Sequence, residues 1–209
     1  MNPSELLRTR LDECALVAII RGVKPDEAEA IGGAIFDAGI RIIEVPLNSP
    51  DPLASIERLA ARFGQSALIG AGTVLDPQQV EQVRNAGGRL VVSPNTNSDV
   101  IRATVAAGMV SSPGYFTPSE GFEALAAGAH ALKLFPAEAA TPAVVKAQRA
   151  VLPPQVPLLV VGGIQPDNMQ PWLDAGANGF GLGSGLYAPG RSTEDTAARA
   201  RAYVAGIRR

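Results

Sequence analysis

A lysine inside an apolar run is the clearest sign of chemistry in this sequence. The chain has three lysines, and Lys24 and Lys146 lie in an expected loop and helix, where solvent exposure is the rule. Lys133 instead lies within Ala-Leu-Lys-Leu-Phe, an expected strand. Burial disfavours the ammonium form and lowers its pKa, which gives a nucleophilic amine able to form a Schiff base. An outward-facing lysine whose stem passes between helices explains the position alone equally well.

Glu44 favours the chemical interpretation of Lys133. It is the only acidic residue within an apolar strand run, and a buried carboxylate without a partner costs several kcal/mol. One isolated acid and one isolated amine indicate a shared pocket, with Glu44 as general acid or base and Lys133 as nucleophile. A structural ion pair is the alternative. Arg21, at the end of the first run, would then be a third partner, or it would clamp a substrate carboxylate.

Glycines follow the last two apolar runs. Gly162 and Gly163 follow the seventh run, and Gly183, Ser184 and Gly185 follow the eighth. Glycine lets the bare backbone approach an anion closely, and barrels of alternating strands and helices often bind phosphate after these two strands. The sequence therefore predicts a phosphate site formed by these glycines and Ser184.

Short apolar runs that alternate with helical patterns must position these residues. Eight runs are typical of strands covered on both faces, namely 16–20, 41–45, 67–69, 89–92, 109–111, 131–135, 157–161 and 179–182. Amphipathic spacing, usually after a proline, predicts helices over 25–38, 77–86, 98–107, 118–127, 142–151 and 166–175. An Ala-Gly pair precedes five of the strands, which is typical of a repeated strand–helix unit.

Eight strand–helix units predict an α/β protein, specifically a single (β/α)8 TIM barrel spanning residues 1–209 as one domain. Residues 2–13 predict an extra N-terminal helix that covers the bottom of the barrel. An open, doubly wound sheet is the competing fold, but eight units without a central reversal favour the barrel. Catalytic groups in such barrels lie at the C-terminal ends of the strands, where the residues singled out above fall.

Composition limits the classes of function. Of 209 residues, 46% are hydrophobic and 18% charged, which suits a large core, and the net charge of −2 gives no basic surface for nucleic acid or a membrane. The one short basic run consists of Arg199, Arg201, Arg208 and Arg209. It lies on or after an expected terminal helix and indicates a solvated helix face. No apolar run is long enough to span a bilayer.

The cysteine and histidine content narrows the chemistry further. Cys14 is the only cysteine, so it can form no internal disulfide; we expect it to be buried and the protein to be cytoplasmic. His130 is the only histidine, which excludes zinc sites that need several. No acidic cluster indicates a divalent metal. The segment 70–72, Gly-Ala-Gly, lacks the third glycine and the acidic residue of a dinucleotide-binding fingerprint, so we do not expect this segment to bind a dinucleotide.

Taken together, these segments resemble the 2-keto-3-deoxy-6-phosphogluconate / 6-phosphogalactonate aldolase family from about residue 16 to 203. The matching motifs are Ala-Ile-Ile-Arg-Gly at 18–22, Glu-Val-Pro-Leu-Asn-Ser at 44–49, Gly-Ala-Gly-Thr-Val at 70–74, Ser-Pro-Asn at 93–95, Leu-Lys-Leu-Phe-Pro-Ala-Glu at 132–138 and Val-Gly-Gly-Ile at 161–164. The resemblance implies a class I aldolase without metal or cofactor. It also implies a phosphorylated keto-deoxy sugar acid as substrate and a homotrimer.

The same resemblance assigns roles to individual residues. It makes Lys133 the Schiff-base lysine and Glu44 the general acid/base. The substrate-binding residues that it implies are Arg21, Thr73 and Pro94 at the pyruvate end, Phe135 and Val161, and Gly162, Gly163, Gly183 and Ser184 at the phosphate.

Two departures from the gluconate pattern favour a galactonate-type enzyme. Gluconate enzymes usually carry Glu-Val-Thr-Leu-Arg-Thr after the second strand and Thr-Gly-Gly after the seventh, where this chain has Pro46, Asn48 and Val161. The two substrates differ at C4, and losing a threonine hydroxyl there removes a hydrogen-bond partner. The gluconate epimer, a phosphosugar isomerase or epimerase, and a non-catalytic phosphosugar sensor are the alternatives. The pair Tyr115-Phe116 has no assigned role.

Overall fold

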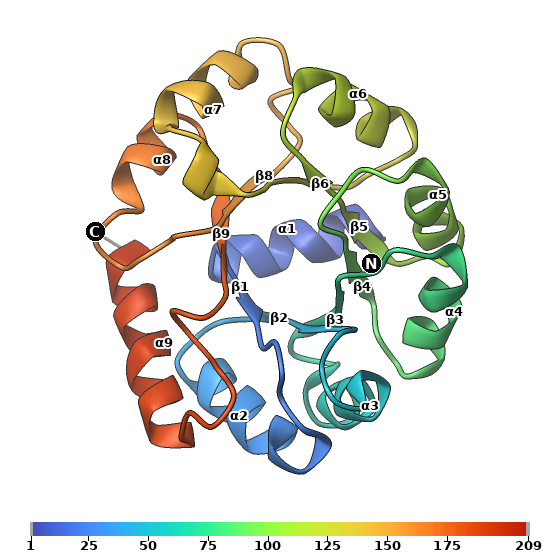
Figure 1. Ribbon diagram of the computed structural model, residues 1–209, viewed down its shortest axis with the longest axis vertical. Helices are drawn as coiled ribbons and strands as arrows, with labels where there is room; N and C mark the ends of the chain where they lie inside the picture. The colour runs from blue at the N-terminus through green and yellow to red at the C-terminus, as the bar shows by residue number, and fades with distance from the viewer. Residues whose placement is uncertain (1, 208–209) are drawn as a thin grey trace.

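The computed structural model describes residues 2–207 (Figure 1). Nine parallel strands lie in the order β5-β4-β3-β2-β1-β9-β8-β7-β6. They are β1 (Leu16–Ile19), β2 (Ile42–Pro46), β3 (Leu68–Gly72), β4 (Leu90–Val92), β5 (Val110–Ser112), β6 (Gly114–Tyr115), β7 (Leu132–Leu134), β8 (Leu158–Val161) and β9 (Gly179–Leu182). Only Pro113 separates β5 from β6, the two ends of this order, so the sheet curls into a nearly closed barrel.

Helices alternate with the strands and cover the outside of the barrel (Figure 1). They are α1 (Pro3–Glu13), α2 (Pro25–Asp37), α3 (Pro52–Phe63), α4 (Pro77–Asn85), α5 (Ser98–Ala106), α6 (Pro118–Ala126), the 3₁₀ helix η1 (Ala137–Ala139), α7 (Pro142–Arg149), α8 (Gln170–Asp174) and α9 (Thr193–Ile207). Proline in the first turn has no N–H to leave unpaired, which is why it starts most of these helices.

Two hydrophobic clusters divide the core. The larger one packs the outer faces of the strands against the helices. The smaller one fills the barrel interior with residues such as Val17, Ile42 and Leu159, and it includes Leu7 and Leu11 of α1. Helix α1 therefore covers the bottom of the barrel, as Figure 1 shows behind the strands.

The structure corrects the strand and helix predictions in three places. The fifth predicted run, 109–111, is β5, and a short strand that was not predicted, β6, follows beyond Pro113, which cannot donate to the ladder and interrupts it. Helix α3 was not predicted, although its apolar positions Ile56 and Leu59 are fully buried. The helix predicted over 166–175 shortens to α8, since residues 166–168 form a turn and residue 169 a bend.

Tyr115, for which the sequence offered no role, anchors a helix. Its hydroxyl donates to Oε1 of Gln148 on α7 at 2.7 Å, and Nε2 of Gln148 donates to the Phe116 carbonyl at 2.9 Å. Phe116 packs against the outer core. The aromatic pair therefore fastens α7 to the segment after β6.

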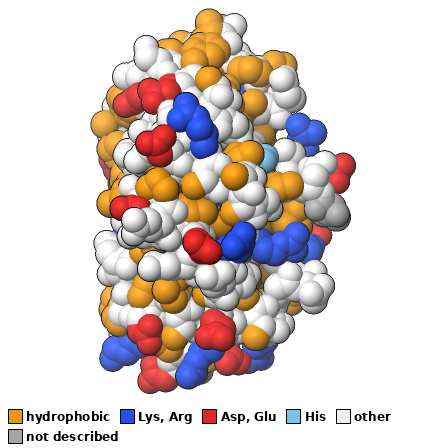
Figure 2. All heavy atoms as spheres, turned by 90° about the vertical axis from the view of Figure 1, so that its right-hand side faces the viewer, with side chains coloured by type: hydrophobic (Ala, Val, Ile, Leu, Met, Phe, Trp, Pro, Cys, Tyr) orange, Lys and Arg blue, Asp and Glu red, His pale blue; other side chains and the backbone are white. Residues whose placement is uncertain are grey.

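The surface agrees with the low net charge. On the face that Figure 2 shows, acidic and basic side chains lie interspersed among apolar ones. Arg199 and Arg201 are exposed on α9, as predicted, whereas Arg208 and Arg209 lie outside the described residues. Cys14 is buried, also as predicted. Within residues 2–207, no helix is long and apolar enough to cross a membrane.

Candidate active site

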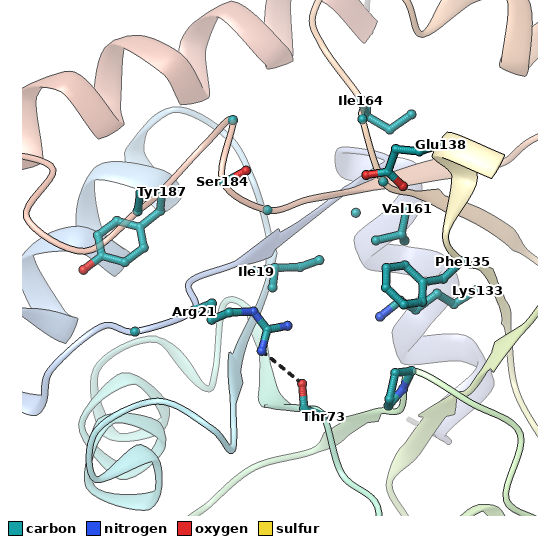
Figure 3. Close-up of a pocket in the computed structure, with 18 of the residues that line it drawn as sticks. Ile19, Arg21, Thr73, Lys133, Phe135, Glu138, Val161, Ile164, Ser184 and Tyr187 are labelled. Carbon is teal, nitrogen blue, oxygen red and sulfur yellow. Dashed lines mark hydrogen bonds between the residues drawn. The ribbon is translucent and has the colours of Figure 1, made fainter. Parts of the chain in front are cut away.

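A pocket opens at the C-terminal ends of the strands (Figure 3). Its volume, counted as space open to the centre of a water molecule, is about 390 Å³. Ten of the eleven residues predicted for the site line it: Arg21, Thr73, Pro94, Lys133, Phe135, Val161, Gly162, Gly163, Gly183 and Ser184. Glu44, the eleventh, lines a smaller cavity inside the barrel, and Lys133 lines both spaces. Ile19, Val161 and Gly181 also line both spaces, so the two spaces meet at these residues and Lys133.

Lys133 faces the interior of the barrel and not the surrounding helices. Only 8% of it is exposed, and its Nζ lies 4.8 Å from the ring centroid of Phe135, which stands beside it in Figure 3. Burial lowers the pKa of the amine, partly offset by the charge of Glu44, while Arg21 lowers the pKa further. The interpretation of Lys133 as an outward-facing lysine is therefore wrong. Near neutral pH, a larger fraction of its side chain is the neutral amine than for an exposed lysine.

Glu44 lies in the middle of β2 with 1% of its surface exposed. Burial raises the pKa of its carboxyl group to about 7, against the opposing pull of Lys133 and Arg21. Oε2 of Glu44 has no hydrogen-bond partner. Within residues 2–207, no ion pair of 4.0 Å or less joins Glu44 to Lys133. The two residues therefore do not form the structural ion pair that was the alternative to a catalytic role.

Arg21 and Thr73 meet at one side of the pocket mouth. Nη1 of Arg21 donates to Oγ1 of Thr73 at 3.4 Å, the dashed line in Figure 3, and to Oδ1 of Asn48. Thr73 has φ 56°, a left-handed conformation that is strained for a β-branched residue and is often found at functional sites. The sequence analysis used Asn48 to distinguish the galactonate from the gluconate type but did not select it as a site residue.

The glycine loops present unused backbone donors. Gly162 and Gly163 have φ 122° and 65°, which favour glycine. Among the described residues, no hydrogen bond uses the N–H of Gly163, Gly183 or Ser184. The Ser184 carbonyl accepts from Nη1 of Arg191 at 2.9 Å, which steadies the second loop. Exposed backbone N–H groups beside a pocket suit an anion.

Glu138 was not predicted and lies against the first glycine loop. It belongs to η1, it is exposed, and it lines the pocket beside Val161 in Figure 3. A Cβ built on Gly162 would lie 1.9 Å from Oε2 of Glu138 and 2.9 Å from the backbone nitrogen of Ala137, which cannot move aside as a side chain can. Gly162 therefore has a steric reason, besides its positive φ, to be glycine. No group of three or more His, Cys, Asp or Glu within residues 2–207 could hold a metal ion.

Comparisons with known proteins identify the family of this chain. The family model for KDPG and KHG aldolase matches residues 7–199. The chain is 50% identical, over 92% of its length and 94% of the other protein, to 2-dehydro-3-deoxy-6-phosphogalactonate aldolase of Escherichia coli strain K12. It is 33% identical to the KHG/KDPG aldolase of the same organism, over 76% of this chain and 74% of that protein. A solved structure described as native KDPGal is 50% identical over 92% of this chain and 94% of that one, with a TM-score of 0.91.

These matches define the class of protein as an aldolase, which is a carbon–carbon lyase. The chain belongs to the KDPG and KHG aldolase family. Identity is higher to the galactonate-type relative than to the KHG/KDPG aldolase, in the direction predicted from Asn48 and Val161.

Proposed function

We propose that the chain cleaves 2-keto-3-deoxy-6-phosphogalactonate to pyruvate and glyceraldehyde 3-phosphate through a Schiff base on Lys133. One observation carries the proposal. A buried amine stands at the junction between an interior space that contains a buried acid and an open pocket lined by glycine backbone. This arrangement supports a nucleophile, an acid/base group and an anion site within one region, as the reaction requires.

The first half of the reaction builds an electron sink. The neutral amine of Lys133 attacks the C2 ketone and forms a carbinolamine, which loses water to give a protonated imine. Lowering the pKa of Lys133 by burial increases the fraction of amine available for this attack.

The second half breaks the carbon–carbon bond. Glu44 takes the proton of the C4 hydroxyl as the C3–C4 electron pair moves into the imine, so that glyceraldehyde 3-phosphate leaves and an enamine remains. The enamine is protonated at C3, and water releases pyruvate from Lys133. A carboxyl pKa near 7 suits a group that must both accept and return a proton at neutral pH.

The remaining residues fix the position of the substrate. Arg21 and Thr73 bind the carboxylate, while Pro94 and Phe135 flank the pyruvate unit. Backbone N–H groups of Gly162, Gly163, Gly183 and Ser184 bind the phosphate at the other end of the pocket. Holding both ends of the substrate orders the reacting carbons before the reaction begins.

Val161 supports the galactonate epimer as substrate. It lines the pocket between the catalytic lysine and the glycine loop and offers no hydrogen bond where a gluconate-type enzyme carries a threonine. A paired assay of the two C4 epimers, with pyruvate release coupled to NADH oxidation, tests this choice. We expect the larger kcat/KM for the galactonate epimer; a larger value for the gluconate epimer would reverse the assignment.

Finer features of the fold and the assembly belong to the same proposal. We infer that β5 and β6 are one interrupted strand of a (β/α)8 barrel, with residues 1–209 as one domain and α1 as an additional helix. We further propose a cytoplasmic homotrimer that works without cofactor, nucleic acid or membrane. Light scattering of the purified protein tests the trimer, and a monomeric mass would contradict it.

A further inference from the structure

Two buried polar atoms near the catalytic lysine lack a hydrogen-bond partner. They are Oε2 of Glu44 on β2 and Oγ of Ser112 on β5. Their residues are 1% and 2% exposed. An unpartnered buried polar atom costs about 1–3 kcal/mol, so two of them in one region call for a physical reason.

Ser112 faces the same interior space as Glu44. Side chains alternate along a strand, and Val110, two residues earlier, belongs to the cluster that fills the barrel. Ser112, Glu44 and Lys133 together line the small interior cavity, whose other walls are mainly apolar and include Leu7 of α1. The three polar groups come from β5, β2 and β7, so only the closed barrel brings them together.

The cavity has room for one water. Its volume, counted as space open to the centre of a water molecule, is about 20 Å³. A single water needs roughly 10–15 Å³ on that measure and two to four polar partners. Glu44, Ser112 and Lys133 supply three such partners, which would satisfy both unpartnered atoms at once.

We propose that Ser112 is a positioning residue for the aldolase reaction, and that its hydroxyl fixes a buried water between Glu44 and Lys133. This inference rests on the function proposed above. A serine hydroxyl donates one hydrogen bond and accepts others, so it can set the orientation of the water. The water then reaches Glu44 on one side and the amine on the other, a pair that no direct ion pair joins among residues 2–207.

The bridge moves one proton at a time. The Lys133 ammonium gives a proton to the water while the water gives another to Glu44, which leaves a neutral amine, a neutral carboxyl group and an unchanged water. The uncharged pair is the form that a dry interior favours. Arg21 is the other charged group that acts on both partners. In the reverse direction the bridge returns the proton needed when the carbinolamine loses water.

Ser112→Ala tests the inference, with two readouts: steady-state cleavage, and exchange of the pyruvate methyl protons in deuterium oxide, each as a function of pH. We expect both rates to fall about tenfold, less than the ~10²–10⁴-fold that an acid/base group itself contributes. The pH profile should shift, while KM for the sugar acid stays at the parent value. Ser112→Cys, which keeps a weak donor of similar size, should recover part of the rate.

Ser55→Ala is the matched control. Ser55 is also a fully buried serine whose hydroxyl lacks a partner, but it lies on α3, outside the barrel interior. Parent rates and an unshifted pH profile in Ser112→Ala would overturn the inference, as would an equal loss in Ser55→Ala. If Ser112→Ala fails to fold, Ser112→Cys replaces it: a shifted pH profile supports the inference, and the parent profile overturns it. Retention of a pyruvate adduct by Lys133→Met would instead refute the proposed function itself.

Discussion

A side chain on Gly72 would collide with the carboxyl group of Glu44, because a Cβ built there would lie 2.0 Å from Oε2 and 2.4 Å from Oε1. Gly72 ends β3, which pairs with β2, and its bare backbone forms the wall against which the acid rests. Glycine at this position therefore leaves the room that the Glu44 carboxyl group occupies.

Gly72→Ala should displace the Glu44 carboxyl group. We expect about a 10²-fold fall in kcat, the cost of misplacing a reacting group by about 1 Å, and about 1–3 kcal/mol of lost stability from overpacking. Steady-state kinetics and urea unfolding measure the two effects. Gly33→Ala is the control, since its Cβ would meet only ordinary contacts and alanine favours the helix. Full activity in Gly72→Ala would show that the acid tolerates displacement.

Because of Glu44, the free energy of unfolding should decrease as the pH rises. Its folded pKa of about 7 exceeds the ordinary value of 4.5, so between these values the folded state holds a proton that the unfolded state has released. Stability falls through that window, and Glu44→Gln, which does not titrate, should gain roughly 3 kcal/mol over the parent above pH 7 and little below pH 4.5.

Urea unfolding of the parent and Glu44→Gln at both ends of that window measures this difference, and Glu57→Gln on the exposed face of α3 is the control. The same Glu44→Gln protein should lose turnover more than imine formation, since Glu44 is proposed to move protons in the cleavage step as well as during formation of the imine. An identical pH dependence of stability in parent and variant would contradict the burial of a titrating carboxyl group.

Gly183→Ala should weaken phosphate binding without harming the fold. A Cβ at this position would meet no atom within 4 Å, and the backbone is not left-handed there. We expect about a tenfold higher KM for the sugar acid, equivalent to about 1.4 kcal/mol, and weaker inhibition by inorganic phosphate. Exchange of pyruvate protons, which involves no phosphate, is the internal control. An unchanged KM would remove Gly183 from the phosphate site.

Val161→Thr should shift the preference between the C4 epimers. A hydroxyl introduced into the pocket wall gains about 0.5–1.5 kcal/mol where it finds a partner, so we expect the ratio of kcat/KM values to move up to about tenfold toward the gluconate epimer. The ratio cancels general losses of active enzyme. Val160→Thr, whose side chain faces the helices, is the control and should leave the ratio unchanged.

The sequence predicted those features that a single strand determines. Lys133 and Glu44 stood out because each is a charged residue in an apolar run, and the barrel followed from the repeated unit. Features that depend on neighbouring strands were missed. The space that Gly72 leaves for Glu44 and the hydrogen bond from Arg21 to Asn48 arise only when neighbouring strands pair. Ser112 and Lys133 line one cavity only because the sheet curls into a barrel.

Local irregularities were also beyond the sequence pattern. Pro113 separates β5 from β6, a two-residue strand that periodicity alone cannot predict. Glu138 belonged to the matching segment 132–138 but was given no role, yet it lines the pocket and borders the first glycine loop. Its position would have required knowledge of where η1 lies.

Reduction of the pyruvate complex with borohydride tests the central claim most directly. Peptide mass mapping should find the reduced adduct on Lys133 alone, and Lys133→Met should form none while Lys146→Ala, altered on the exposed face of α7, should form it at the parent level. An adduct on Lys24 or Lys146, or no adduct at all, would contradict the account.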